Sequence, residues 1–281
     1  MKQLYKYILI VCAAALVFSC EETITIDTST TDSKVVIEGL VTNVASGSYV
    51  KLSRSRNFYD NGQTARITDA QVTVNTSTGE QIVFIHNPSG GTDSIGYYFP
   101  NPNFAGTVGT TYTLNVEVEG KTYTAAEEMQ PVTTIDSLTS KIDEDEFDDP
   151  EEPGRHFAVF FFAKEPQDRA DYYLFKFYRN GELLLDWPTD IYIADDEALG
   201  ETIDDVEIAG YFKEGDKAKV EMYSLTRNGF IFYSDLSTLL NNDGGMFSPP
   251  PANPRTNLSN GAMGYFQVSA VDALEITVED N

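Results

Sequence analysis

Cysteine and positive charge are both scarce in this sequence. Its 281 residues include only two cysteines, and 19 lysines and arginines stand against 44 aspartates and glutamates, so the net charge is −25. A nucleic-acid-binding surface needs a basic face toward the phosphate backbone, and this balance therefore argues against a nucleic-acid partner. It argues equally against electrostatic attachment to anionic lipids.

Residues for metal or nucleophilic chemistry are also few. The two histidines, His86 and His156, stand far apart, and neither belongs to a zinc-binding motif. The sequence has no Gly-x-Ser-x-Gly nucleophile elbow and no phosphate-binding loop that ends in Gly-Lys-Ser or Gly-Lys-Thr. We therefore expect no catalytic residues, no metal and no cofactor, and a protein that is not an enzyme. A hydrolase stays open as an alternative, because the fold can bring together the three residues of a Ser-His-Asp triad that lie far apart in the sequence.

The first twenty residues have the pattern of an export signal. Lys2 and Lys6 precede an unbroken apolar run at 8–18, which is shorter than the roughly 20 residues that a membrane-spanning helix needs. Such a run is typical of a secretory signal peptide. It ends in Val-Phe-Ser-Cys at 17–20, which resembles a bacterial lipobox. We predict that residues 1–19 are removed and that Cys20 receives the lipid; the alternative is an ordinary signal peptide that ends near a cysteine.

The residues after the lipobox predict a tether and a surface-export signal. Cys20 would be the only thiol of the processed chain, so no intramolecular disulfide could form, and its acyl chains would supply the membrane attachment. Glu21 and Glu22 follow directly, and acids at this place resemble the signal that exports lipoproteins of Bacteroidota to the cell surface. We expect residues 20–33 to be a tether that holds the protein on the outer membrane, facing the exterior. The alternative is that these acids only solvate the tether.

The rest of the chain predicts a mainly β fold with two antiparallel, immunoglobulin-like sandwich domains. Short β-type runs such as 35–41 alternate with Gly, Asn, Asp and Pro, and residues 34–132 are expected to form the first sandwich. Gly109-Thr-Thr-Tyr112 precedes an alternating strand and resembles the tyrosine corner, in which a phenol bonds to nearby backbone. The alternative is that Tyr112 is simply a core aromatic.

The second half is expected to follow an acidic linker at 133–156. Residues 143–153 hold eight acids, and such a run repels itself. Calcium binding is the alternative, although the run lacks the EF-hand pattern. Residues 157–281 are predicted to form the second β domain, with one short helix at 229–241 where apolar residues recur at helical spacing.

A proline-rich loop supplies the candidate interaction site. Met and Phe stand beside three prolines in 246–251, and apolar residues in a rigid exposed loop can dock a protein. The alternative is a loop that packs on its own domain. We expect 246–260 and the loop at 87–107 to build the partner surface. The candidate residues are Phe247, Pro249, Pro250, Pro251 and Asn253.

Several stretches together resemble one family of Bacteroidota lipoproteins, catalogued as domain of unknown function 4249. They run in order from Cys20 almost to the C-terminus, and the most specific are YTAAEEMQPVTTIDSL at 123–138 and FSPPPANPRTNLSNGAMGYF at 247–266. Residues 139–156 and 186–206 do not match the pattern. The resemblance implies no catalytic residues.

Members of this family are typically encoded beside TonB-dependent outer-membrane receptors. The resemblance therefore implies an outer-membrane lipoprotein that assists such a receptor without catalysis, by capturing or gating a nutrient. The alternative is a structural or adhesive surface lipoprotein without a transport role.

Overall fold

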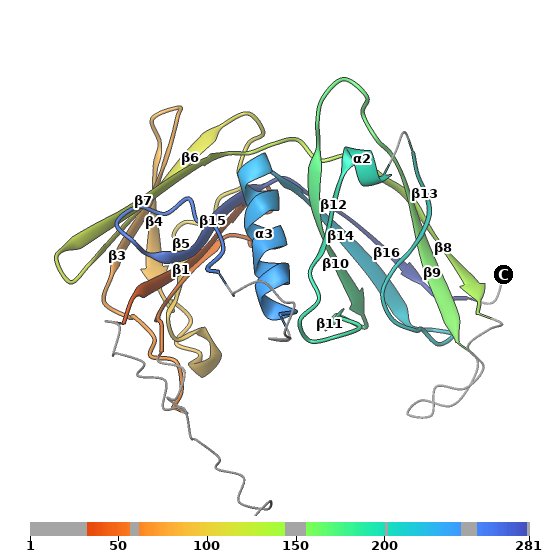
Figure 1. Cartoon of the computed structure of the whole chain (residues 1–281), viewed down its shortest axis with the longest axis horizontal. Coiled ribbons are helices and arrows are strands. Elements are labelled where there is room, and N and C mark those ends of the chain that lie inside the picture. The colour runs from red at the N-terminus through yellow and green to blue at the C-terminus, as the bar shows by residue number, and fades with distance from the viewer. Residues whose placement is uncertain (1–32, 57–61, 144–155, 200–201, 243–251, 280–281) are drawn as a thin grey trace, which may run out of the picture. The chain divides into compact units, whose positions relative to one another are not determined.

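Strands dominate the computed structural model, and the expected mainly β class is confirmed (Figure 1). The structure describes residues 33–56, 62–143, 156–199, 202–242 and 252–279. The predicted signal peptide, the lipidated cysteine and almost all of the tether lie outside these residues. Within the described part, no helix combines the length and the apolar character that crossing a membrane requires.

The largest sheet has eight strands in the order β15-β1-β2-β5-β4-β3-β6-β7. Seven strands come from the first half of the chain, and β15 joins them from the C-terminal end by pairing parallel to β1, with Val36 beside Met263. Their bounds are β1 Val35–Thr42, β2 Tyr49–Arg54, β3 Gln71–Thr76, β4 Gln81–His86, β5 Tyr97–Pro100, β6 Thr111–Val118, β7 Lys121–Glu128 and β15 Met263–Ser269. A short 3-10 turn, η1 (Thr92–Ser94), precedes β5.

The two edges of this sheet approach each other. Gln130, just after β7, forms a parallel bridge with Ser269 at the end of β15. The segment before β15 lies beside β7, since the amide of Ser259 donates to the carbonyl of Thr124 in β7 at 2.9 Å. The sheet is therefore nearly closed and barrel-like.

Alternating side chains fill the interior of this sheet. In β6, Tyr112, Leu114 and Val116 are buried while the residues between them are not, as the two-residue period of a strand requires. The hydroxyl of Tyr112 accepts a hydrogen bond from the amide of Thr107 at 2.7 Å. Tyr112 is thus both a core aromatic and a residue whose phenol bonds to backbone shortly upstream.

Two smaller sheets make the second half. One has the order β11-β10-β14-β16, with β12 also paired to β10, and the other has the order β13-β9-β8. Phe161 and Phe175 meet between them, with ring centroids 5.5 Å apart, and both sheets contribute to one core. Their bounds are β8 Ile135–Ile142, β9 Phe157–Lys164, β10 Tyr172–Arg179, β11 Glu182–Leu184, β12 Tyr192–Asp195, β13 Thr202–Glu207, β14 Lys217–Leu225 and β16 Val271–Thr277. A single helical turn, α2 (Asp196–Leu199), follows β12.

Helix α3 (Arg227–Leu240) and a third apolar cluster join the two halves (Figure 1). The cluster brings Leu40 of β1 against Leu174 of β10 and Leu225 of β14. Phe230 and Tyr233 of α3 pack on the same cluster. Residues from Ser33 onward consequently form one compact unit.

Two expected boundaries need correction. The predicted linker 133–156 contains strand β8, which pairs with β9 along its length, because Ile135 and Leu138 bury in the second core. Residues 144–155, with most of the acidic run, lie outside the described residues, so the linker and calcium interpretations of that run stay predictions. The predicted C-terminal domain 157–281 includes β15, but β15 belongs to the first sheet, and its Phe266 and Val268 are buried in the first core.

Candidate functional site

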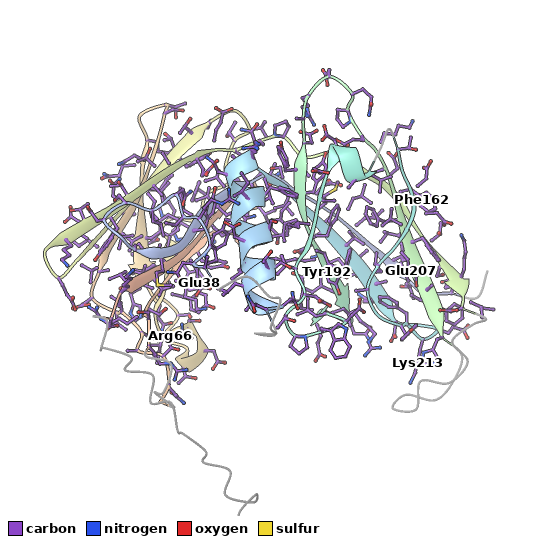
Figure 2. The ribbon with its side chains drawn as sticks, viewed as in Figure 1. Glu38, Arg66, Phe162, Tyr192, Glu207 and Lys213 are labelled. Carbon is purple, nitrogen blue, oxygen red and sulfur yellow. The ribbon has the colours of Figure 1, made fainter. Side chains whose placement is uncertain are left out.

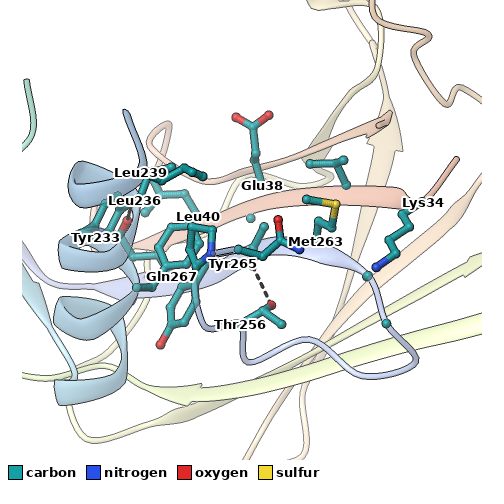
Figure 3. Close-up of a pocket in the computed structure, with 18 of the residues that line it drawn as sticks. Lys34, Glu38, Leu40, Tyr233, Leu236, Leu239, Thr256, Met263, Tyr265 and Gln267 are labelled. Carbon is teal, nitrogen blue, oxygen red and sulfur yellow. Dashed lines mark hydrogen bonds between the residues drawn. The ribbon is translucent and has the colours of Figure 1, made fainter. Parts of the chain in front are cut away.

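A cavity of about 560 Å³ lies between α3 and the outer face of β1 and β15 (Figure 3). Cavities of roughly 300–1,000 Å³ are typical of small-molecule sites. Most of the walls are apolar or aromatic side chains. They include Val36, Leu40, Tyr49, Phe232, Tyr233, Leu236, Leu239, Met263 and Tyr265.

Helix α3 supplies one wall. Its first turn is fixed by the Thr226 hydroxyl, which accepts from the amide of Gly229 at 3.1 Å, a typical N-cap that satisfies a free helical donor. Phe232, Leu236 and Leu239 then recur at helical spacing on one face and line the cavity. The predicted helix at 229–241 is confirmed, and its apolar face forms this wall.

Strands β1 and β15 supply the opposite wall. Their parallel register places Glu38 beside Tyr265 and Leu40 beside Gln267, so alternate residues of both strands face α3. The close approach depends on Gly264, which has φ +97°. A Cβ added there would lie 2.2 Å from the carbonyl oxygen of Ile37.

Several polar side chains in the walls bond to other protein groups. The Tyr233 hydroxyl donates to Gln267 Oε1 at 2.5 Å, and the Gln267 amide donates to Ser269 Oγ at 2.7 Å. The Tyr265 hydroxyl donates to the buried carboxylate of Glu127. The Thr256 hydroxyl donates to the Gly264 carbonyl at 2.6 Å, the dashed line in Figure 3. The cavity therefore offers ring faces and aliphatic groups more than free hydrogen-bond donors.

Charge is distributed unevenly around the cavity. Glu38 is paired with Lys51, whose Nζ lies 2.9 Å from its Oε1. Lys34 also lines the cavity, and within the part of the chain that the structure describes its ammonium has no ion pair. Burial, with the nearby Glu38 and Tyr97, raises the pKa of Tyr49 to about 12, so this wall residue is neutral at physiological pH.

Of the five candidate residues in the predicted partner loop, only Asn253 is among the described residues. Asn253 is exposed and lines the cavity; Phe247, Pro249, Pro250 and Pro251 lie outside the described residues, as do Cys20, Glu21 and Glu22. The loop at 87–107 reaches the same region through Tyr97, whose ring centroid lies 5.6 Å from that of Tyr49. The predicted surface is thus adjacent to the cavity at these two points.

A second cavity of about 630 Å³ lies in the other half, lined in part by Tyr192 of β12 and Glu207 of β13 (Figure 2). Much of its wall consists of Phe161, Phe175 and Phe177, which are buried residues of the second core. Burial, with the acids Asp143, Asp186 and Asp205, raises the pKa of Glu207. We place the candidate site at the first cavity, because it lies on the outer face of β1 and β15, whereas the second is walled largely by side chains of the core.

The histidines have structural surroundings. His86 Nε2 accepts from the amide of Gly96 at 3.0 Å, and its ring packs on Tyr98. His156 is buried against Tyr211. A search of the described residues found no group of three or more His, Cys, Asp or Glu side chains that could hold a metal ion.

Glu165, Asp171 and Tyr173 form a buried acid cluster at the start of β10. The Tyr173 hydroxyl lies 3.0 and 2.9 Å from the two oxygens of Glu165 and 3.2 Å from Asp171 Oδ2. Arg169 Nε donates to both oxygens of Asp171, at 2.9 and 2.7 Å. One hydroxyl has one proton to donate, so a proton on Glu165 relieves the contact between the two carboxyl groups. Burial raises the pKa of Glu165 to about 7, with Tyr173 opposing the shift and Asp171 adding to it.

The comparisons assign the chain to a family. The family model described as Domain of unknown function (DUF4249) matches residues 21–275, and the chain belongs to this family. A search of the curated proteins found no match.

Proposed function

We propose that this chain is a non-catalytic binding protein, held on the outer membrane by a lipid at Cys20, that assists a TonB-dependent transporter by capturing or gating a nutrient. The observation that supports binding best is the largely apolar cavity between α3 and β1/β15. Family membership supports the transporter association only through gene neighbourhood, because members are expected to be encoded beside TonB-dependent receptors. The Bacteroidota origin, the surface-export role of Glu21 and Glu22 and the immunoglobulin-like character of the two halves also remain predictions.

A tether suits this role. The processed chain would have 14 residues, 21–34, between Cys20 and the first strand at Val35, and an extended chain spans at most roughly 3.3–3.6 Å per residue. The first strand would then begin within roughly 50 Å of the membrane. A tether of this length would keep the folded unit close to a transporter in the same membrane.

A structural or adhesive role is the second candidate, and one feature favours it. Trp187 is 71% exposed, and Leu183 and Leu185 on the same stretch are 50% and 39% exposed. Large apolar side chains that gather on a surface commonly mark a contact with another molecule. This patch lies on and just beyond β11, at the edge of the five-stranded sheet, and none of its residues lines the first cavity.

Co-purification from the native outer membrane tests the proposal. The lipoprotein is tagged at its C-terminus and recovered in mild detergent, beside a Cys20→Ala chain as control. We expect a TonB-dependent receptor in roughly stoichiometric amount with the wild type only. Recovery of the lipoprotein alone, with uptake and growth unchanged on deletion, contradicts the proposal and favours the structural or adhesive role.

A further inference from the structure

We infer that the cavity under α3 binds an amphipathic organic carboxylate, with an apolar body against α3 and a carboxylate beside Lys34. The inference rests on the proposed binding function and adds the chemical class of the ligand. It concerns residues of β1, α3 and β15 together with Lys34, which directly precedes β1.

The walls favour an apolar body. Phe232 and Tyr265 stack with centroids 4.8 Å apart, and Leu236, Leu239 and Met263 complete the surface. Burial of apolar area away from water is favourable in proportion to the area buried, so an aliphatic or aromatic group gains affinity here.

The same walls disfavour a sugar. A saccharide gives up hydrogen bonds to water along its whole length and needs protein donors and acceptors in return. The Tyr233, Tyr265 and Gln267 side chains are already bonded to other protein groups. A ligand rich in hydroxyl groups would therefore find few replacement partners along these three side chains.

Lys34 gives the cavity a cationic end. In Figure 3, Lys34 lies at the end of the site opposite Tyr233, Leu236 and Leu239. Its backbone is fixed, because its amide donates to Ser55 Oγ at 2.9 Å and its carbonyl accepts from the Ser55 amide at 2.8 Å.

The competing charge at the cavity is already paired. Glu38 bonds Lys51 on the neighbouring strand at 2.9 Å, whereas Lys34 has no ion pair within the described residues. The chain's other acids act on an anion only through solvent, where physiological salt screens charges over about 8 Å. Charge complementarity at the cavity itself therefore favours a carboxylate over a neutral or cationic head group.

Calorimetric titration with dodecanoate tests the inference. The chain from residue 20 onward is expressed without residues 1–19 and with Cys20→Ala, so that no acyl group of its own competes, and dodecanoate is kept below its micelle concentration. Methyl dodecanoate, which has the same body without the charge, is the matched ligand. We expect saturable one-to-one binding of dodecanoate, and weaker binding of the ester.

Four variants locate the two ends of the ligand. Lys34→Met is expected to weaken dodecanoate binding roughly three- to tenfold, as a partly exposed ion pair does, and to leave the ester unchanged. Lys121→Met makes the same charge change at the exposed start of β7 and should alter neither. Leu236→Ala should weaken both ligands. Leu240→Ala, at a 46% exposed position outside the cavity, should alter neither.

Three results would overturn the inference. They are no saturable binding of dodecanoate, equal loss of acid and ester binding in Lys34→Met, and binding to anionic phosphatidylglycerol vesicles without binding of monomeric dodecanoate. Unchanged thermal unfolding of each variant shows that folding is not the cause. Receptor co-purification is measured separately, so a failed ligand assignment with the receptor still recovered leaves the proposed function standing.

Discussion

Alanine at Gly264 probes the contact between β15 and β1 that builds one wall of the cavity. Gly264 has φ +97°, a conformation that costs a residue with a Cβ about 1–3 kcal/mol. The added Cβ would also lie 2.2 Å from the Ile37 carbonyl oxygen and 3.3 Å from its amide nitrogen, and overpacking of this kind adds about 1–3 kcal/mol. Gly264→Ala should therefore lower the free energy of unfolding by about 2–6 kcal/mol.

Gly261 is the matched control. It also has a positive φ, +74°, and also lines the cavity, but nothing lies within 4 Å of the position that its Cβ would take. Gly261→Ala should therefore carry only the conformational cost of about 1–3 kcal/mol. The difference between the two variants isolates the close approach of the strands.

Urea unfolding at 25 °C measures both losses, with the slope of each transition checked against the wild type. The expected result is a clearly lower midpoint for Gly264→Ala than for Gly261→Ala. Coincident midpoints with equal slopes would refute the reasoning, because β15 would then not pass so close to the Ile37 carbonyl.

Three further predictions concern the helix, the acid cluster and the anchor. Thr226→Ala removes the N-cap of α3 and should cost about 1 kcal/mol, which is a fall of roughly 2–4 °C in melting temperature for a unit of this size; an unchanged melting temperature would contradict the cap. The pKa of Glu165 is raised to about 7 in the folded state, above its ordinary value near 4.3, so the folded state binds the proton more tightly. Its contribution to stability is complete below about pH 4 and is lost as pH rises through about 7; Glu165→Gln should flatten the stability curve in that window, and an unchanged curve would place the titration elsewhere. Cys20→Ala should leave the protein unprocessed or soluble, whereas fractionation with the outer membrane like the wild type would contradict lipidation.

Local features of the fold were predictable because local residues determine them. Asn180-Gly181 predicts a tight hairpin, and both residues have positive φ between β10 and β11. The apolar spacing of Phe232, Leu236 and Leu239 predicted α3. Gly215-Asp216 also predicts a hairpin, between 208–212 and 217–225. This prediction is wrong, because Phe212 bridges to Phe157, while β14 pairs with β10 and β16.

Long-range pairing could not be read from the chain. Nothing local to residues 263–269 indicates that they run parallel to Val35–Thr42, more than two hundred residues earlier. The cavity depends on that pairing and on α3 lying across it. Of the candidate residues named from the sequence only Asn253 lines it, although the predicted partner loop 246–260 also contributes Pro254 and Thr256. The one sequence signal for this region was the close match of 247–266 to the family pattern, and this stretch contains the first residues of β15.

Photolabelling with a diazirine-tagged hydrocarbon tests most directly the central claim that the cavity under α3 is the ligand site. The full chain is labelled at limiting probe, digested, and its peptides are mapped. We expect label on peptides that contain 232–239 and 263–267, with the label lost when Leu236 is replaced by Glu and kept when Leu240 is. Label concentrated instead at Leu183 and Trp187, with none at the cavity, would contradict it and point to the exposed edge as the binding surface.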